Sequence, residues 1–153
     1  MRRLRKFLAL SPAKQAIVLR SLLLLPVVAS LLRARGMERT RAWLERLGPF
    51  AAGDTASLVP REIAELVGAA ASLLQAQCLP RSLVLWHFLR NRSLRVEVRL
   101  GVSKRTDGSL SAHAWVELNG LPLNDGLDVF ERYAAMPSRA TRFTSSHPKT
   151  LSV

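Results

Sequence analysis

The single cysteine of the chain occupies a position suited to a nucleophile. In the stretch "QAQCLPRSLVLW", Cys78 precedes Pro80 and an apolar run. Proline is common in the first turn of a helix, so we expect a helix to begin one or two residues after Cys78. Its free N–H groups and dipole favour a thiolate, and Arg81 adds positive charge. The same N–H groups would stabilise an oxyanion, with Gln75 or Gln77 as a further donor.

A histidine and an aspartate further along the chain would complete a set for nucleophilic catalysis. His113 lies between two alanines in "SAHAWVEL", a strand-like stretch, and Asp125 follows on the next predicted strand. An imidazole can take the thiol proton and return it to a leaving amine, while a third group orients the ring. A structural interpretation stays open, because an isolated cysteine or histidine is more often part of the core. Asp125 would then cap a turn.

The register of the predicted hairpin decides which side chain reaches His113. A two-residue turn at Asn119-Gly120 places Asp125 on the strand face away from His113 and Asn124 on the same face. A one-residue bulge reverses this parity. We therefore predict a bulge, or an equivalent three-residue loop, with Asp125 as the partner of His113. A flat two-residue turn would favour Asn124.

The remaining candidates carry weaker signals. Trp115 shares a strand face with His113, where it would either wall a substrate cleft or pack in the core. Asp128 is a second candidate partner of His113, or an N-cap for "VFERY". The three histidines and one cysteine lack the spacing of metal ligands, and the chain has no glycine-rich phosphate-binding motif, so we expect no metal and no cofactor.

The order of the predicted elements indicates an α+β fold. Helical patterns begin at Ser11-Pro12 and at Pro60, and Pro26 is expected to kink or end the first helix. After the helix that follows Cys78, strands are predicted over residues 95–104, 111–118 and 121–125. Helices first and an antiparallel meander second are typical of α+β domains. We expect one domain over 1–153, with a basic helical region at 1–59, a catalytic core at 60–136 and a loose tail at 137–153.

The charge of the chain is concentrated in its first third. Residues 1–46 hold 11 Lys/Arg against 2 Asp/Glu, whereas residues 47–153 hold 12 against 9. Aromatic residues make up 6%, and no nucleic-acid motif is present, so we expect no nucleic-acid partner. The apolar stretch from Ser21 to Leu32 is too short to span a bilayer, although contact with a membrane surface stays open. One cysteine suits a reducing compartment, and we expect a cytoplasmic protein.

Several motifs together resemble one enzyme family. "CLPRSLVLWHFLR", "RLGVSK", "AHAWVELNG" and "LPLND" are similar to segments of the transglutaminase-like cysteine proteases of lasso peptide biosynthesis. The resemblance covers roughly residues 60–130. It implies a papain-like or transglutaminase-like α+β fold, with a β-meander packed on the catalytic helix. It also implies a triad of Cys78 as nucleophile, His113 as base and Asp125 as orienting carboxylate, which removes the leader from a ribosomally made precursor.

The resemblance also implies partners. About 60 residues precede the protease-like core, and they show no strand-rich winged-helix pattern. We therefore expect the split form of the enzyme, which needs the precursor leader peptide and a separate winged-helix, PqqD-like leader-binding protein. The ATP-dependent lasso cyclase is a further candidate partner. Leaders of the family usually carry a threonine before their last residue, which implies a small polar subsite.

Three alternatives are kept. The same triad would transfer the acyl group to an amine, as transglutaminases do. A basic helical adaptor would use Cys78 and His113 only for packing. A membrane-surface protein would use the leucine-rich helix.

Overall fold

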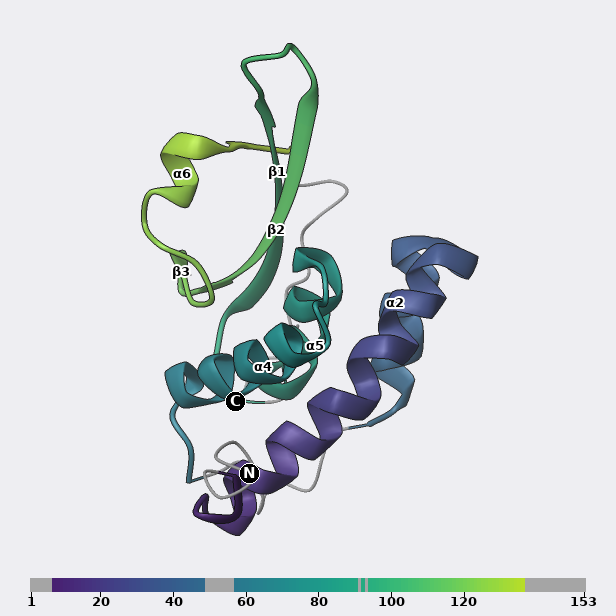
Figure 1. Cartoon of the computed structure of the whole chain (residues 1–153), viewed down its shortest axis with the longest axis vertical. Coiled ribbons are helices and arrows are strands. Elements are labelled where there is room, and N and C mark those ends of the chain that lie inside the picture. The colour runs from purple at the N-terminus through teal and green to yellow at the C-terminus, as the bar shows by residue number, and fades with distance from the viewer. Residues whose placement is uncertain (1–6, 49–56, 91, 93, 137–153) are drawn as a thin grey trace, which may run out of the picture.

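The computed structural model describes residues 7–48, 57–90, 92 and 94–136, and it confirms the α+β class. Helices come first: α2 (Pro12–Arg46), α4 (Pro60–Leu73) and α5 (Cys78–Leu89). Strands β1 (Val96–Lys104), β2 (Leu110–Leu118) and β3 (Leu121–Pro122) follow, then the short helix α6 (Val129–Arg132) and β4 (Ala134–Ala135). Figure 1 shows the sheet rising from the helical part of the molecule, with α6 beside it. The predicted tail at 137–153 lies outside the described residues.

The long N-terminal helix breaks at a glycine and not at the predicted proline. The backbone of α2 departs from helical angles at Gly36, with φ 74° and ψ 178°, a combination that suits a residue without a Cβ. Pro26 lies inside the helix, so the prediction that the helix ends there is wrong. Leu25 and Val28 on either side of Pro26 are buried, and their packing holds this turn in place. The chain turns back after Gly36, as Figure 1 shows.

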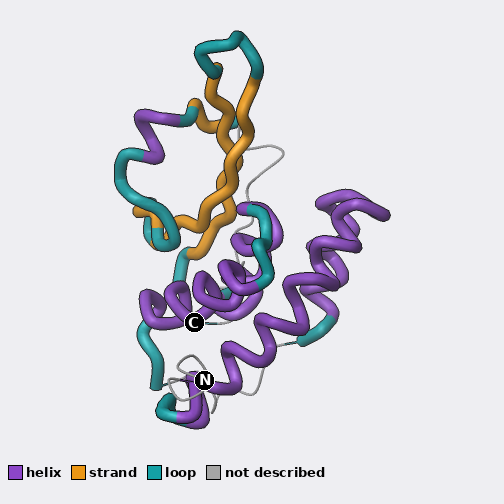
Figure 2. Tube along the Cα trace, in the orientation of Figure 1, coloured by secondary structure: helices purple, strands orange, loops and turns teal. Residues whose placement is uncertain are grey.

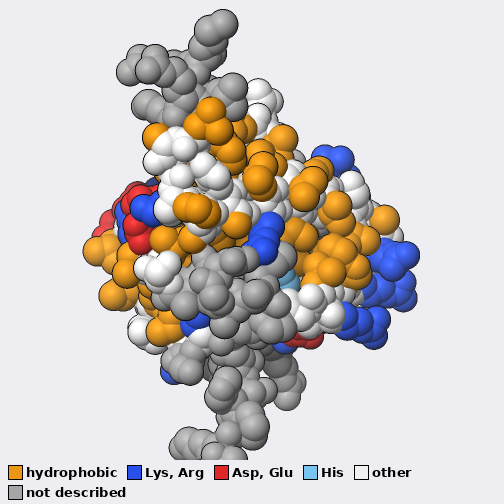
Figure 3. All heavy atoms as spheres, turned by 90° about the horizontal axis from the view of Figure 1, so that it is seen from below, with side chains coloured by type: hydrophobic (Ala, Val, Ile, Leu, Met, Phe, Trp, Pro, Cys, Tyr) orange, Lys and Arg blue, Asp and Glu red, His pale blue; other side chains and the backbone are white. Residues whose placement is uncertain are grey.

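One face of α2 exposes apolar side chains. Leu19, Leu23 and Val27 recur every fourth residue and are 52%, 71% and 43% exposed. Contrary to the sequence-based expectation, α2 is long and apolar enough to cross a membrane by length and composition. Helices of folded soluble cores and signal sequences meet the same criteria, so this property does not locate the protein. Figure 3 shows hydrophobic side chains gathered on the right of the lower face, where α2 lies, with Lys and Arg side chains at its edge.

The core forms where α2, α4 and α5 meet one face of the sheet. Helix α5 is buried almost throughout, from Pro80 to Leu89 apart from Arg81, which agrees with its predicted apolar character. It packs against α2 and α4 on one side and against β1 and β2 on the other. Ile17 and Leu25 of α2, Ile63 and Val67 of α4, and Val98 of β1 are fully or almost fully buried in this cluster. Helix α5 is therefore fixed on several sides.

The sheet has the order β3-β2-β1-β4 and is antiparallel throughout. After β3 the chain crosses through α6 to the opposite edge, where Ala134 and Ala135 pair with β1, as the tube in Figure 2 shows. No sequence pattern predicted this two-residue strand. The crossing carries the segment 123–133 over the second face of the sheet.

That second face is also buried, although the alternation of apolar and polar residues in 95–104 predicts a strand with a single buried face. Glu97 and Glu117 are 4% and 6% exposed on this side. Arg99 pairs with both carboxylates, and Trp115 donates a hydrogen bond from Nε1 to Glu117 Oε1. Glu97 and Glu117 can be buried on this face because their carboxylates are paired with Arg99 and Trp115.

Candidate active site

Cys78 is the first residue of α5 and is partly buried. The helix therefore begins at Cys78 itself, one or two residues earlier than predicted. Gln77 is the N-cap residue, and its side chain makes no capping hydrogen bond. The amides of Cys78 and Leu79 lie in the first turn, where N–H groups have no acceptor within the helix. They are free to donate to an oxyanion beside the thiol.

One turn further along the helix, a buried serine joins α5 to β2. Ser82 is fully buried and donates to the carbonyl of Ala114, the residue after His113, over 3.0 Å. Asn124 donates from Nδ2 to Ser82 Oγ over 3.3 Å and accepts from the Val116 N–H over 2.7 Å. A rise of about 1.5 Å per residue places Cys78 roughly 6 Å along the helix axis from Ser82. The helix start and the His113 segment are therefore neighbours.

The hairpin turn contradicts the predicted bulge. Leu118 pairs with Leu121 across a two-residue turn in which both Asn119 and Gly120 have positive φ, of 53° and 86°. The parity argument fails because β3 ends early. The N–H of Val116, at the edge of β2, donates to the side chain of Asn124 and not to its backbone. The chain has therefore already left the sheet before Asp125.

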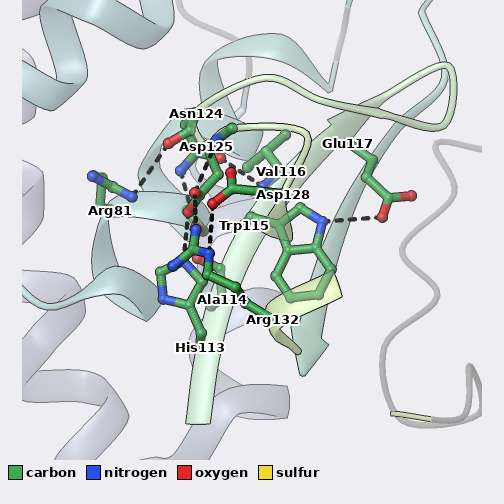
Figure 4. Close-up of polar contacts among 12 residues, drawn as sticks. Arg81, His113, Ala114, Trp115, Val116, Glu117, Asn124, Asp125, Asp128 and Arg132 are labelled. Carbon is green, nitrogen blue, oxygen red and sulfur yellow. Dashed lines mark hydrogen bonds and ion pairs between the residues drawn. The ribbon is translucent and has the colours of Figure 1, made fainter. Parts of the chain in front are cut away.

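Asp125, and not Asn124, contacts the histidine. His113 Nε2 lies 2.5 Å from Asp125 Oδ2. Figure 4 shows the two side chains pointing toward one another. The other carboxylate oxygen accepts from Arg132 Nη2 over 3.1 Å and from the Gly126 N–H over 3.0 Å. Burial acts to raise the pKa of Asp125, but the hydrogen bond to His113, the Gly126 amide and the charge of Arg132 outweigh it. The pKa of this carboxyl is therefore lower than that of an ordinary aspartate.

Aromatic rings fix the imidazole from the side. The ring of Tyr133 stacks on His113 with centroids 4.9 Å apart, and Trp115 stacks at 6.2 Å. Trp115 is completely buried, so it packs beside His113 and does not wall a cleft. Gly101 lies opposite His113 in the ladder, and a Cβ there would come within 2.9 Å of both Trp115 and Tyr133.

Three of these neighbours carry weak signals or none in the sequence. Ser82, Arg132 and Tyr133 lie in helical or short irregular stretches whose patterns have no chemical signature. The spacing of Arg132 from Asp128 is the one local signal, and these two residues do pair, over 2.8 Å. Asp128 was predicted either as a second partner of His113 or as an N-cap. It stands at the N-cap position of α6, but its side chain makes no capping hydrogen bond.

Two hollows flank the first turn of α5. A pocket of about 420 Å³ lies between α2 and the segment 74–80, and its lining includes Gln75 and Gln77, both exposed. A second, of about 330 Å³, is lined by Asp125 and by Arg81, whose Nη2 donates to the Asn124 carbonyl. The first turn of α5 therefore borders both spaces, through Pro80 and Arg81, while Cys78 is not in the described lining of either.

A comparison with models of known protein families agrees with the α+β fold described above. The model of the transglutaminase-like superfamily matches residues 15–138, which includes nearly all of α2. The chain belongs to this superfamily. No curated protein and no solved structure matches it.

Membership of the transglutaminase-like superfamily is compatible with cysteine peptidase or transglutaminase activity. The arrangement offers a thiol at a helix start, first-turn amides and a histidine held by a carboxylate. Among the described residues, no hydrogen bond joins the Cys78 thiol to His113. Catalytic hydrogen bonds of this kind often tighten when substrate binds.

Proposed function

We propose that the protein is a cysteine peptidase in which Cys78 is the nucleophile, His113 the base and Asp125 the orienting group. The observation that best supports this proposal is the 2.5 Å contact of His113 Nε2 with Asp125 Oδ2, next to the helix that starts at Cys78. An ionised carboxylate can only accept, so Nε2 carries the proton and Nδ1 is the acceptor. That nitrogen is the one left to take the thiol proton.

The reaction follows from these roles. His113 Nδ1 removes the proton from Cys78, and Sγ attacks the scissile carbonyl carbon. The first-turn amides of α5 stabilise the oxyanion. The carbon–nitrogen bond then breaks as Nδ1 gives the proton to the leaving amine, which leaves a thioester. Water, deprotonated by the same nitrogen, attacks the thioester and releases a free acid and the thiol.

The substrate we propose is the leader–core junction of a lasso peptide precursor, in the cytoplasm. This part of the proposal is supported by the resemblance of the segments around Cys78, His113 and Asp125 to the leader peptidases of that pathway. It includes the two partners that the resemblance implies, a leader-binding protein and the ATP-dependent cyclase.

Alkylation of the single cysteine tests the proposal without a known substrate. We expect iodoacetamide to modify Cys78 in the folded protein, with appreciable rates below pH 7. His113→Ala should lower these rates to those of a free thiol, whereas both proteins should react alike once denatured. A thiol that reacts only after denaturation would refute the peptidase and favour a structural cysteine in a helical adaptor. Normal peptide cleavage by Cys78→Ala would refute it equally.

Acyl transfer is the second candidate, because the same superfamily also suits transglutaminase activity. The two reactions share the thioester and differ in what attacks it. The mass of the product separates them: a free leader acid indicates hydrolysis, and an amide with an added amine indicates transfer.

A further inference from the structure

The pocket between α2 and α5 has the position and lining of a substrate subsite. Of its described lining residues, Gln77 and Leu79 are the chain neighbours of Cys78. Leu25, Ala29 and Leu32 of α2 and Leu74 of the preceding turn provide most of the apolar wall. A volume of about 420 Å³ lies within the range of about 300–1,000 Å³ typical of ligand sites. The pocket therefore adjoins the residues on either side of Cys78, although Cys78 itself is not in its described lining.

The two pockets are separate spaces that both border the first turn of α5. Their described linings share no residue: Leu79 and Pro80 border the first, and Arg81 and Asp125 the second. In the proposed reaction the leaving amine takes its proton from His113, which is bonded to Asp125. The leaving part of the substrate is therefore assigned to the His113 side of Cys78. The acyl part, which becomes the thioester, belongs on the α2 side.

The charge in the described lining of the pocket is positive only. Arg33 is exposed and is the charged residue among the described residues of the lining, to which no carboxylate contributes. In the described part of the chain Arg33 makes no ion pair, and Arg35 lies two residues further along α2. An apolar space with a guanidinium at its edge suits a peptide that carries an aliphatic side chain and, near it, a carboxylate.

We infer that this pocket selects the acyl side of the substrate, and that it takes an aliphatic side chain of a peptide segment whose neighbouring carboxylate pairs with Arg33. This selection differs from the small polar subsite that the family resemblance implies for the leader residue before the last. The inference rests on the proposed function, since it assumes that acyl groups are transferred to Cys78. It assigns to α2 a direct part in specificity, in addition to its part in the core.

Peptidyl chloromethyl ketones test the apolar part. In these reagents the thiolate displaces chloride and forms a thioether, while the peptide occupies the acyl side. We expect acetyl-Leu-Gly or acetyl-Gly-Leu chloromethyl ketone to alkylate Cys78 at least about tenfold faster than the diglycyl reagent. Ala29→Trp, which fills the pocket, should abolish this preference. Ala34→Trp, on an exposed position of α2 outside the lining, should keep it.

The pairing of a substrate carboxylate with Arg33 is tested with acetyl-Asp-Leu and acetyl-Asn-Leu chloromethyl ketones. A preference for aspartate that Arg33→Glu reverses and Arg35→Glu leaves in place supports the pairing. Equal rates with both reagents in the parent protein would overturn it.

Iodoacetamide separates a failure of the subsite from a failure of the peptidase. If iodoacetamide alkylates the folded parent in a His113-dependent way but leucyl and glycyl reagents react alike, the pocket proposal is wrong and the peptidase stands. The pocket proposal is equally wrong if Ala29→Trp retains the leucyl preference. If iodoacetamide fails to modify the folded protein, the peptidase is wrong and the subsite proposal is wrong with it.

Discussion

At the scale of single residues, one carboxylate, that of Asp125, determines the tautomer and the orientation of the His113 imidazole. Asp125 Oδ2 fixes Nε2, and Asp125 Oδ1 is held by Arg132 and by the Gly126 amide. Because the pKa of Asp125 is lowered, its carboxylate stays ionised to a lower pH than that of an ordinary aspartate. Across the neutral range the proton on Nε2 is therefore always held by a charged acceptor.

Asp125→Asn should impair catalysis more than stability. The amide can present its NH₂ to Nε2 and so favour the tautomer in which Nδ1 carries the proton and cannot accept one from the thiol. We expect kcat/KM, and the alkylation rate of Cys78 at pH 7, to fall by at least about tenfold. Asp128→Asn is the matched control, because Asp128 also pairs with Arg132 but makes no contact with His113 in the described structure. Equal rates in the two variants would show that Asp125 does not orient the base.

At the scale of elements, the sequence predicted those parts whose signals are local. The starts of the helices at Pro12 and Pro60, and the strand at 96–104, follow from proline placement and from alternation. Helix α2 does not end at Pro26, because burial on both sides of this residue overrides the local cost of proline in a helix. A sequence pattern cannot show which turn of a helix the rest of the core will hold in place.

The pairing of His113 with Asp125 was predicted for an incorrect reason. The predicted bulge assumed that the strand runs on to Asp125, but β3 ends at Pro122. Asn124 and Ser82 then form the link between β2 and α5, a contact between residues 42 positions apart in the chain. Such a link leaves no mark in the local pattern. The residue types for chemistry were therefore predictable, while the polar contacts that position them were not.

Gly101→Ala tests whether the packing of the sheet holds the imidazole. The added Cβ would meet Trp115 and Tyr133, the two rings that stack on His113. We expect a loss of about 1–3 kcal/mol in the free energy of unfolding, measured by urea denaturation, together with slower alkylation of Cys78. Gly68→Ala is the control, since a Cβ there meets nothing within 4 Å and α4 should gain up to about 1 kcal/mol. Unchanged stability of Gly101→Ala would mean that the rings move aside freely.

At the scale of the whole molecule, the helical layer carries a histidine that couples stability to pH. His87 of α5 is 1% exposed, between the helices and the sheet. Burial, and then the charge of Arg90, lower the pKa of His87 from 6.5 to about 4, against a smaller opposing effect of the Leu44 backbone. Its neutral form belongs to the folded state. Any gain of a proton at this site therefore favours the unfolded chain.

The sign of the pH dependence follows from that difference. Between pH 6.5 and 4 the unfolded chain binds more protons at His87 than the folded protein, so the stability present above pH 6.5 is lost as the pH falls. The shift in pKa corresponds to about 3 kcal/mol between pH 7 and pH 4. We expect urea denaturation to show this decline in the parent and a much flatter profile in His87→Leu, whatever the absolute stability of that variant. The comparison concerns slopes, so parallel profiles would show that His87 is not the group that makes the fold sensitive to acid.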